Sequence, residues 1–163
     1  MKIVTSFPGA NIRILSQEKD IVYLAPDLRD TIGDWFYWCF AVEEADGRTI
    51  TFVFDSPVRG GYYGAAVSHD FSEWHWQYES EGEPDRFTYT FSNGEGRVYF
   101  AHDMLYRPER IVNLAESLGI HSDMLCKSRK GRHIPCFTFG TGEKTVILTS
   151  RHHACESTGS MHG

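Results

Sequence analysis

Two histidines, a cysteine and a glutamate stand close together in SRHHACES, Ser150–Ser157, directly after the apolar run TVILT. His153 and Glu156 are three residues apart, so on a helical turn their side chains project from nearly the same face. A neutral imidazole and a carboxylate are two of the three protein ligands of a catalytic His2Glu zinc site. The spacing therefore suggests His153 and Glu156 as the first two ligands of a zinc ion.

The same spacing also has a simpler explanation. With 8 His and 22 Asp and Glu among 163 residues, about one His-x-x-Asp/Glu pair is expected by chance. A polar junction after a strand often holds His and Glu for capping or solvation alone. His152 would point elsewhere on the turn, and the pair His152/His153 could bind adventitious metal whatever the function. Both interpretations stay open on spacing alone.

Composition and charge narrow the possible functions. A chain of 163 residues with 41% hydrophobic residues can bury one ordinary core, or one modest domain and part of a second. The net charge of −6 and the lack of a basic run longer than KSRKGR, Lys127–Arg132, argue against a nucleic-acid partner. No run approaches the roughly 18 apolar residues of a membrane span, and none after Met1 resembles a signal peptide. These features predict a cytoplasmic protein without a membrane partner.

The four cysteines are Cys39, Cys126, Cys136 and Cys155, and they form no CxxC pair. In a chain without a signal peptide this spacing indicates free thiols and no disulfide framework. Cys39 lies in the apolar run WFYWCFAV, which predicts burial in the core. For Cys155 we favour a small unreactive side chain beside the site over a reactive thiol or an additional metal ligand.

The first hundred residues alternate short aromatic and β-branched runs with turn segments such as EADGR and SNGEG. The run WFYWCFAVEE is apolar on both faces at first, which predicts a central strand between layers. The pattern as a whole predicts an antiparallel β-sandwich of about eight strands. The expected strands are Asn11–Ser16, Asp20–Leu24, Trp35–Glu43, Thr49–Phe54, Tyr62–Val67, Trp74–Glu79, Phe87–Phe91 and Arg97–Ala101.

The pattern changes after Ala101. In YRPERIVNLAESLGI the apolar residues recur at helical spacing, Pro108 suits the first turn and Gly119 suits the position just past the end. We expect one helix of about eleven residues here. Three strands are expected after it, at Asp123–Ser128, His133–Phe139 and Lys144–Thr149. The change in pattern predicts two domains, residues 1–101 and 102–163.

Three segments carry a resemblance to a known family. GRHIPCFTFGTGEKTVILTSRHHACESTGS resembles the first metal-binding segment of zinc carboxypeptidases of the M14 type, where a turn and an apolar strand lead into His-x-x-Glu, here His153 to Glu156. VYFAHDMLYRPERIVNL resembles the segment that opens the catalytic domain in the cytosolic-carboxypeptidase-like branch, although Leu105 stands where that branch usually has proline. AVSHDFSEWHW resembles a hairpin in the β-sandwich that precedes the enzyme in that branch. Together they cover most of the chain in the same order.

The resemblance implies a β-rich α+β fold, in which an N-terminal antiparallel β-sandwich precedes the first helix and strands of an α/β zinc-carboxypeptidase fold. It implies a zinc metallocarboxypeptidase that removes C-terminal residues from peptides or proteins. His153 and Glu156 would be zinc ligands. The zinc ion would polarise the scissile carbonyl and lower the pKa of a bound water, while a separate glutamate would act as general base.

The chain also departs from the family. There the third ligand, a histidine, the substrate-binding arginines and the catalytic glutamate come later, and only STGSMHG follows Glu156 here. His162 is a poor substitute for the third ligand, because it lies in a Gly/Ser tail with no surrounding motif. We therefore expect a truncated catalytic domain that binds zinc weakly or not at all and has no activity alone. Its uncovered sheet edge predicts self-association or pairing with a partner.

Two functions from different classes remain open on the sequence. One is the N-terminal part of a metallocarboxypeptidase whose activity requires a longer chain. The other is a non-catalytic β-sandwich binding or interaction module with a remnant metal segment. Trp74, His75 and Trp76 could form an aromatic platform for such a module, but alternating large aromatics on a strand more often lie half in the core and half on the surface.

Overall fold

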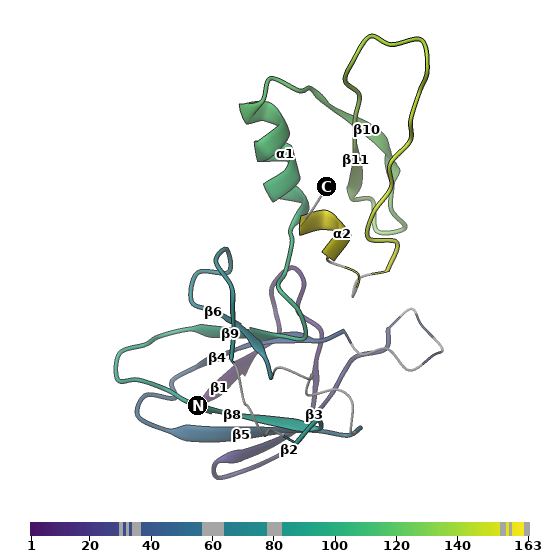
Figure 1. Cartoon of the computed structure of the whole chain (residues 1–163). Helices are drawn as coiled ribbons and strands as arrows, with labels where there is room; N and C mark the ends of the chain where they lie inside the picture. Colours follow the sequence, from purple (N-terminus) through teal and green to yellow (C-terminus); the bar gives the residue numbers. More distant parts are fainter. Residues whose placement is uncertain are drawn as a thin grey trace. The chain divides into compact units, whose positions relative to one another are not determined.

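The computed structural model describes residues 1–29, 31, 33, 37–56, 64–77, 83–153, 156 and 158–161 (Figure 1). The chain divides into two compact units, which are described separately below. The first unit is Met1–Leu105 with His153–Ser157, and the second is Tyr106–His152 with Thr158–Gly163. No helix among the described residues is long and apolar enough to cross a membrane. That residues 1–101 and 102–163 are separate domains stays a prediction.

The first unit is a β-sandwich in which two sheets face each other (Figure 1). One sheet has five strands in the order β1-β4-β9-β6-β7, and every neighbouring pair in it is antiparallel. The other has four strands in the order β2-β3-β5-β8. The strands are β1 Lys2–Val4, β2 Arg13–Glu18, β3 Ile21–Ala25, β4 Cys39–Glu43, β5 Thr49–Phe54, β6 Ala66–Ser68, β7 His75–Trp76, β8 Arg86–Thr90 and β9 Val98–Ala101.

One pair of strands departs from the predicted all-antiparallel sandwich. β3 and β5 run parallel, whereas β2–β3 and β5–β8 are antiparallel. The physical reason lies in the connection, because the chain leaves the four-stranded sheet after β3, forms β4 in the opposite sheet, and returns as β5. A strand that crosses over in this way can re-enter beside its predecessor in the same direction.

The core lies between the two sheets and is largely aromatic. Along β5, TITFVF, every second residue is buried, which is the pattern of a strand with one face on the core. Phe52 from β5 and Phe87 from β8 stack with their ring centroids 4.9 Å apart, and Phe100 from β9 lies 5.4 Å from Phe52. Burying each such side chain contributes about 1.5–3 kcal/mol. The first unit therefore contains its own hydrophobic core, which stabilises the sandwich.

β4 is the central strand that the sequence predicts. It lies between β1 and β9, and its first four residues are fully buried. Phe40 and Val42 pack into the main core, while Cys39 packs on the other face with Ala101 and Leu105. Cys39 is buried as predicted, and burial raises the pKa of its thiol, so this cysteine is neutral.

The other predicted strands agree with the structure to within a few residues, and β1 was not predicted. Parts of three predicted strands lie outside the described residues. These parts are Trp35 and Phe36, Tyr62 and Tyr63, and Tyr78 and Glu79.

The second unit contains the predicted helix, α1 Pro108–Ser117, a two-stranded antiparallel hairpin and one further helical turn. Gly119 follows the helix at φ +71°, and the Ile120 amide donates to the Ala115 carbonyl at 2.8 Å. This is the Schellman motif, which satisfies the last carbonyls of a helix and requires a residue that tolerates positive φ. The hairpin strands are β10 Ser122–Lys127 and β11 His133–Phe137, and the helical turn is α2 Thr158–Met161.

The strand predicted at Lys144–Thr149 is wrong for this structure. Residues 144–149 form no strand, and Val146, Ile147 and Leu148 are 79%, 82% and 85% exposed. An extended segment becomes a strand only when a neighbour accepts its backbone hydrogen bonds, and no described residue pairs with this run. Within Tyr106–His152, where every residue is described, Ala115 alone is buried. Residues 106–152 thus form secondary structure without a buried core.

Candidate functional site: a histidine–glutamate pair

His153 and Glu156 are brought together by a tight turn. The Glu156 amide donates to the His153 carbonyl at 3.2 Å, and the Glu156 carboxylate accepts from the His153 amide at 3.2 Å. The two side chains meet directly, with His153 Nδ1 2.7 Å from Glu156 Oε1. The spacing of three residues therefore places both groups on one face. That they bind a metal stays a prediction.

A backbone feature precedes the turn. Arg151 has φ +55°, and its Nη1 donates to the carbonyl of Tyr106, 45 residues earlier in the second unit. Positive φ is uncommon for a residue with a side chain and persists where surrounding contacts hold it. Arg151 thus orients the segment that leads into the pair and contributes no ligand atom to it.

His153 Nδ1 and Glu156 Oε1 are atom types that bind zinc, and they lie slightly closer together than two zinc ligands would. In a tetrahedral site with bonds of about 2.0–2.1 Å, two ligand atoms lie about 3.3 Å apart. The 2.7 Å contact between His153 Nδ1 and Glu156 Oε1 is a hydrogen bond, so an entering ion would replace it and separate the atoms by about 0.6 Å. Both side chains are about half exposed, at 53% and 51%. Such a movement meets little resistance from packing.

The described residues do not complete a metal site. Among them, no group of three His, Cys, Asp or Glu side chains lies close enough to hold an ion. His152 is exposed. Cys155 and His162, the two remaining sequence candidates, lie outside the described residues. His153 and Glu156 thus fit two positions of a zinc site.

Glu95 lies at the centre of a polar cluster that the sequence does not predict. The Glu95 side chain is 11% exposed. Its Oε1 accepts a hydrogen bond from the Tyr89 hydroxyl at 2.5 Å and lies 2.7 Å from His69 Nε2. Its Oε2 accepts a hydrogen bond from the Ser92 amide at 2.7 Å. Burial opposes ionisation of this carboxyl, but the contacts from Tyr89, His69 and Ser92 prevail and lower its pKa. Burial, together with the contact to Glu95, raises the pKa of Tyr89.

This cluster could be found only from the pairing of strands. His69 directly follows β6 and Glu95 precedes β9, and these two strands are antiparallel neighbours. Antiparallel pairing brings the end of one strand to the start of the other, across 26 residues of sequence. No local spacing signals that contact. The three bonds satisfy the carboxylate, so its role is to hold the loop before β9 against the end of β6.

The hairpin segment AVSHDFSEWHW forms a turn closed by Asp70. Asp70 Oδ1 accepts from the amides of Ser72 and Glu73 at 2.7 and 2.8 Å. Those backbone hydrogen bonds lower the pKa of the Asp70 carboxyl. Trp74 packs against the second core cluster, the buried residues Cys39, Ala101 and Leu105, while His75 is exposed. This stretch is therefore half core and half surface, as expected.

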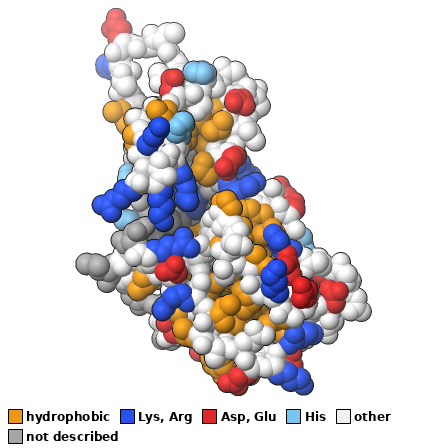
Figure 2. Space-filling model, turned by 180° about the vertical axis from the view of Figure 1, so that it is seen from behind, with side chains coloured by type: hydrophobic (Ala, Val, Ile, Leu, Met, Phe, Trp, Pro, Cys, Tyr) orange, Lys and Arg blue, Asp and Glu red, His pale blue; other side chains and the backbone are white. Residues whose placement is uncertain are grey.

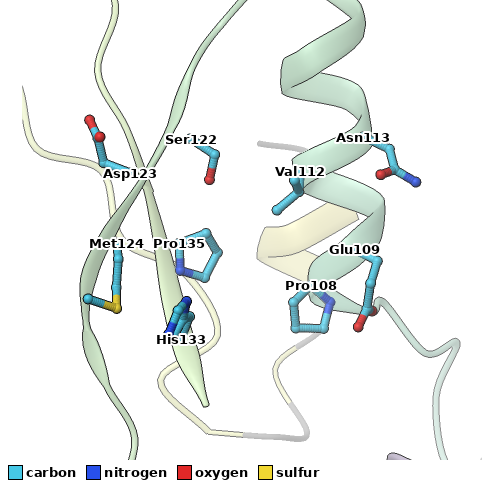
Figure 3. A pocket seen from close by; sticks show the side chains of 9 residues that line it. All are labelled: Pro108, Glu109, Val112, Asn113, Ser122, Asp123, Met124, His133 and Pro135. Carbon is cyan, nitrogen blue, oxygen red and sulfur yellow. The ribbon is translucent and has the colours of Figure 1, made fainter. Parts of the chain in front are cut away.

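A pocket of about 350 Å³ lies inside the second unit, between α1 and the hairpin β10–β11 (Figure 3). Val112 points from the helix toward the hairpin, whereas Asn113 points away from it. The pocket is lined by Pro108, Glu109, Val112, Asn113, Ser122, Asp123, Met124, His133 and Pro135. Neither His153 nor Glu156 belongs to it, so this cavity is separate from the histidine–glutamate pair.

Comparison with known proteins places the fold. No protein-family model matches the chain. An uncharacterized protein of Zymomonas mobilis subsp. mobilis is 29% identical over 168 residues, a match that covers 96% of this chain and 44% of that protein. A metallo-carboxypeptidase from Burkholderia cenocepacia superposes with a TM-score of 0.64 at 17% identity, covering 88% of this chain and 40% of its own.

Two further solved structures have a similar fold. A metallo-carboxypeptidase from Pseudomonas aeruginosa, in complex with (2-guanidinoethylmercapto)succinic acid, gives a TM-score of 0.61 at 27% identity and covers 83% of this chain and 39% of its own. A protein from Burkholderia mallei described as a carboxypeptidase gives 0.68 at 18% identity, covering 87% and 39%. The chain thus spans about two fifths of the length of the relatives it matches. Over most of its length it has a β-rich, carboxypeptidase-like fold.

Proposed function

We propose that this chain is part of a zinc metallocarboxypeptidase of the cytosolic-carboxypeptidase-like branch, an enzyme that hydrolyses the C-terminal residue of a peptide or protein. The observation that carries the proposal is the 2.7 Å contact between His153 Nδ1 and Glu156 Oε1 at the end of the apolar run TVILT, in a chain with a carboxypeptidase-like fold. His153 and Glu156 are the first two zinc ligands. A cytoplasmic location and the lack of nucleic-acid and membrane partners stay predictions from the sequence.

In this proposal the remaining catalytic parts belong to polypeptide that the chain does not span. A third ligand, a general base and groups for the substrate's terminal carboxylate are needed for turnover. The described residues supply no third ligand to the pair. Alone, the chain is expected to bind zinc weakly or not at all and to turn over no substrate.

Calorimetric titration with zinc tests the assignment of the two ligands. We expect weak binding by the chain that is lost in His153→Ala and in Glu156→Gln. The matched control is His152→Ala, which removes the exposed neighbouring imidazole and leaves the contact of the pair intact. Equal loss in His152→Ala and His153→Ala would show adventitious binding by the two adjacent histidines and contradict the assignment.

The alternative of a β-sandwich binding module gains no support from the aromatic stretch. Trp74 packs with Phe7 and Phe71 in the second core cluster, at ring distances that include 5.8 Å between Phe71 and Trp74. An aromatic platform for a ligand needs ring faces at the surface. The geometry of the stretch is that of packing.

A further inference from the structure

The strand β2 lies at one edge of the sandwich, and its outer side pairs with no described strand. In the four-stranded sheet its neighbour is β3 alone (Figure 1). All six residues of β2 are exposed, whereas the other described edge strands, β1, β7 and β8, are shorter and partly buried. An edge strand presents a row of backbone N–H and C=O groups that can pair with a further strand. β2 is therefore the strand best placed to extend a sheet of the first unit.

The side chains of β2 do little to protect this edge. Its sequence, RILSQE, contains neither the lysine nor the proline that often prevents pairing at an edge. Ile14 and Leu15 are 46% and 52% exposed. Figure 2 shows hydrophobic side chains among charged ones at the surface of both units, so exposed apolar area alone does not identify a binding surface. The charges of β2 identify its partner.

Arg13 and Glu18 stand at the two ends of β2 and carry opposite charges. If two copies of β2 pair antiparallel over their full length, Arg13 faces the partner's Glu18, and Glu18 faces the partner's Arg13. Cross-strand pairs of opposite charge stabilise such a pairing, and like charges directly opposite destabilise it. A parallel pairing in register would instead place Arg13 beside the partner's Arg13. The charges of β2 are thus self-complementary in the antiparallel arrangement.

The middle of the strand and the free charges fit the same arrangement. Ile14 lies diagonally from the partner's Leu15, at a spacing that large side chains bridge. Arg13 Nε donates to the Pro26 carbonyl at 3.4 Å, and among the described residues neither Arg13 nor Glu18 forms an ion pair. Both charges are therefore available to a second copy.

We propose that two copies of this chain pair through β2 as antiparallel strands, which joins their four-stranded sheets into one continuous sheet. A twofold interface uses the same patch on both copies, as the paired Arg13 and Glu18 require. One six-residue strand buries less than the roughly 1,200 Å² of a stable interface, and the register shift beside Leu15 adds twist to the strand. We expect a weak dimer with a dissociation constant of about 10–500 µM. The proposal does not depend on zinc binding, on activity or on the second unit.

Sedimentation velocity of the full chain between about 10 µM and about 1 mM tests the proposal. The wild type should shift from monomer to dimer over this range. Arg13→Glu brings two carboxylates together at each end of the paired strands, and Glu18→Arg brings two guanidinium groups together. Each should raise the dissociation constant at least about 10-fold. The control is Lys127→Glu, which changes the net charge as Arg13→Glu does but at an exposed position of β10, and it should dimerise like the wild type.

A charge exchange separates the pairing from other effects of the variants. An equimolar mixture of Arg13→Glu and Glu18→Arg should form a heterodimer, because opposite charges then face each other at both ends. The doubly substituted chain Arg13→Glu/Glu18→Arg keeps the net charge and should dimerise like the wild type. Its recovery would exclude loss of folding, and the interaction of Arg13 with the Asp27 carboxylate, as causes of the single-variant result.

Three results would overturn the proposal. The first is a wild-type chain that stays monomeric up to about 1 mM. The second is a dimer that neither single variant weakens, or that Lys127→Glu weakens equally, since its contact would then lie elsewhere. The third is weakened single variants whose mixture and double variant both remain monomeric, because the two charges would then not face each other.

Discussion

Replacing Glu95 by glutamine should destabilise the β-sandwich by removing one charge from a bonded cluster. Glu95 Oε1 accepts from the Tyr89 hydroxyl and Oε2 accepts from the Ser92 amide. A glutamine keeps the shape, but whichever oxygen becomes the NH2 group then faces a donor. One bond to a charged acceptor contributes about 1.5–3 kcal/mol. With the side chain 11% exposed, we expect Glu95→Gln to lower the free energy of unfolding by about 2 kcal/mol at pH 7.

The effect of Glu95→Gln should depend on pH in one direction. The contacts from Tyr89, His69 and Ser92 outweigh burial and lower the pKa of Glu95 from its ordinary 4.5. A carboxyl whose pKa is lower in the folded state stabilises the protein above pH 4.5, and this contribution is lost as the pH falls through the folded pKa. The difference between wild type and Glu95→Gln should therefore be constant from about pH 6 to 8 and shrink in acid.

Urea unfolding followed by tryptophan fluorescence measures this difference, because Trp38 is fully buried in the sandwich core. The control is Glu18→Gln, at an exposed position of β2. A Glu95→Gln variant no less stable than Glu18→Gln at pH 7 would refute the reasoning. So would a loss of stability that persists undiminished at pH 3.

Three further predictions concern the first unit and the cysteines. Burial, partly opposed by Asp103, lowers the pKa of His102 from 6.5. The free energy of unfolding should therefore fall as the pH drops below about 6.5. In urea unfolding curves measured over a pH series, His102→Gln should reduce this fall. Phe52→Ala should cost about 3–5 kcal/mol in the same assay, because Phe52 is fully buried and packs against the rings of Phe40, Phe87 and Phe100. A thiol reagent should modify Cys126 in the folded chain and leave Cys39 untouched until unfolding, as read by mass spectrometry.

The elements that could be predicted from the sequence are those fixed by local pattern. The alternation in β5, the double-faced apolar run of β4, and Pro108 and Gly119 at the two ends of α1 each predict the observed element. The contact between His153 and Glu156 is local as well, since a spacing of three residues suffices to define it.

The features that could not be predicted depend on distant parts of the chain. The parallel pairing of β3 with β5 follows from an excursion to the other sheet, and the Glu95 cluster follows from the pairing of β6 with β9. The run at residues 144–149 has the right composition for a strand but no described neighbour, so its local preference has no effect. The composition of residues 144–149 predicts a strand, but a strand forms only where a neighbouring strand accepts its backbone hydrogen bonds.

A peptidase assay on the chain joined to the unmatched part of the Zymomonas mobilis relative tests the proposed function most directly. The account predicts zinc-dependent release of the C-terminal residue from a peptide by the joined protein, its loss on chelation and in Glu156→Gln, and no release by the present chain alone. Release that survives both chelation and Glu156→Gln, or a folded joined protein that binds zinc and releases nothing from a panel of peptides with different C-terminal residues, would contradict it.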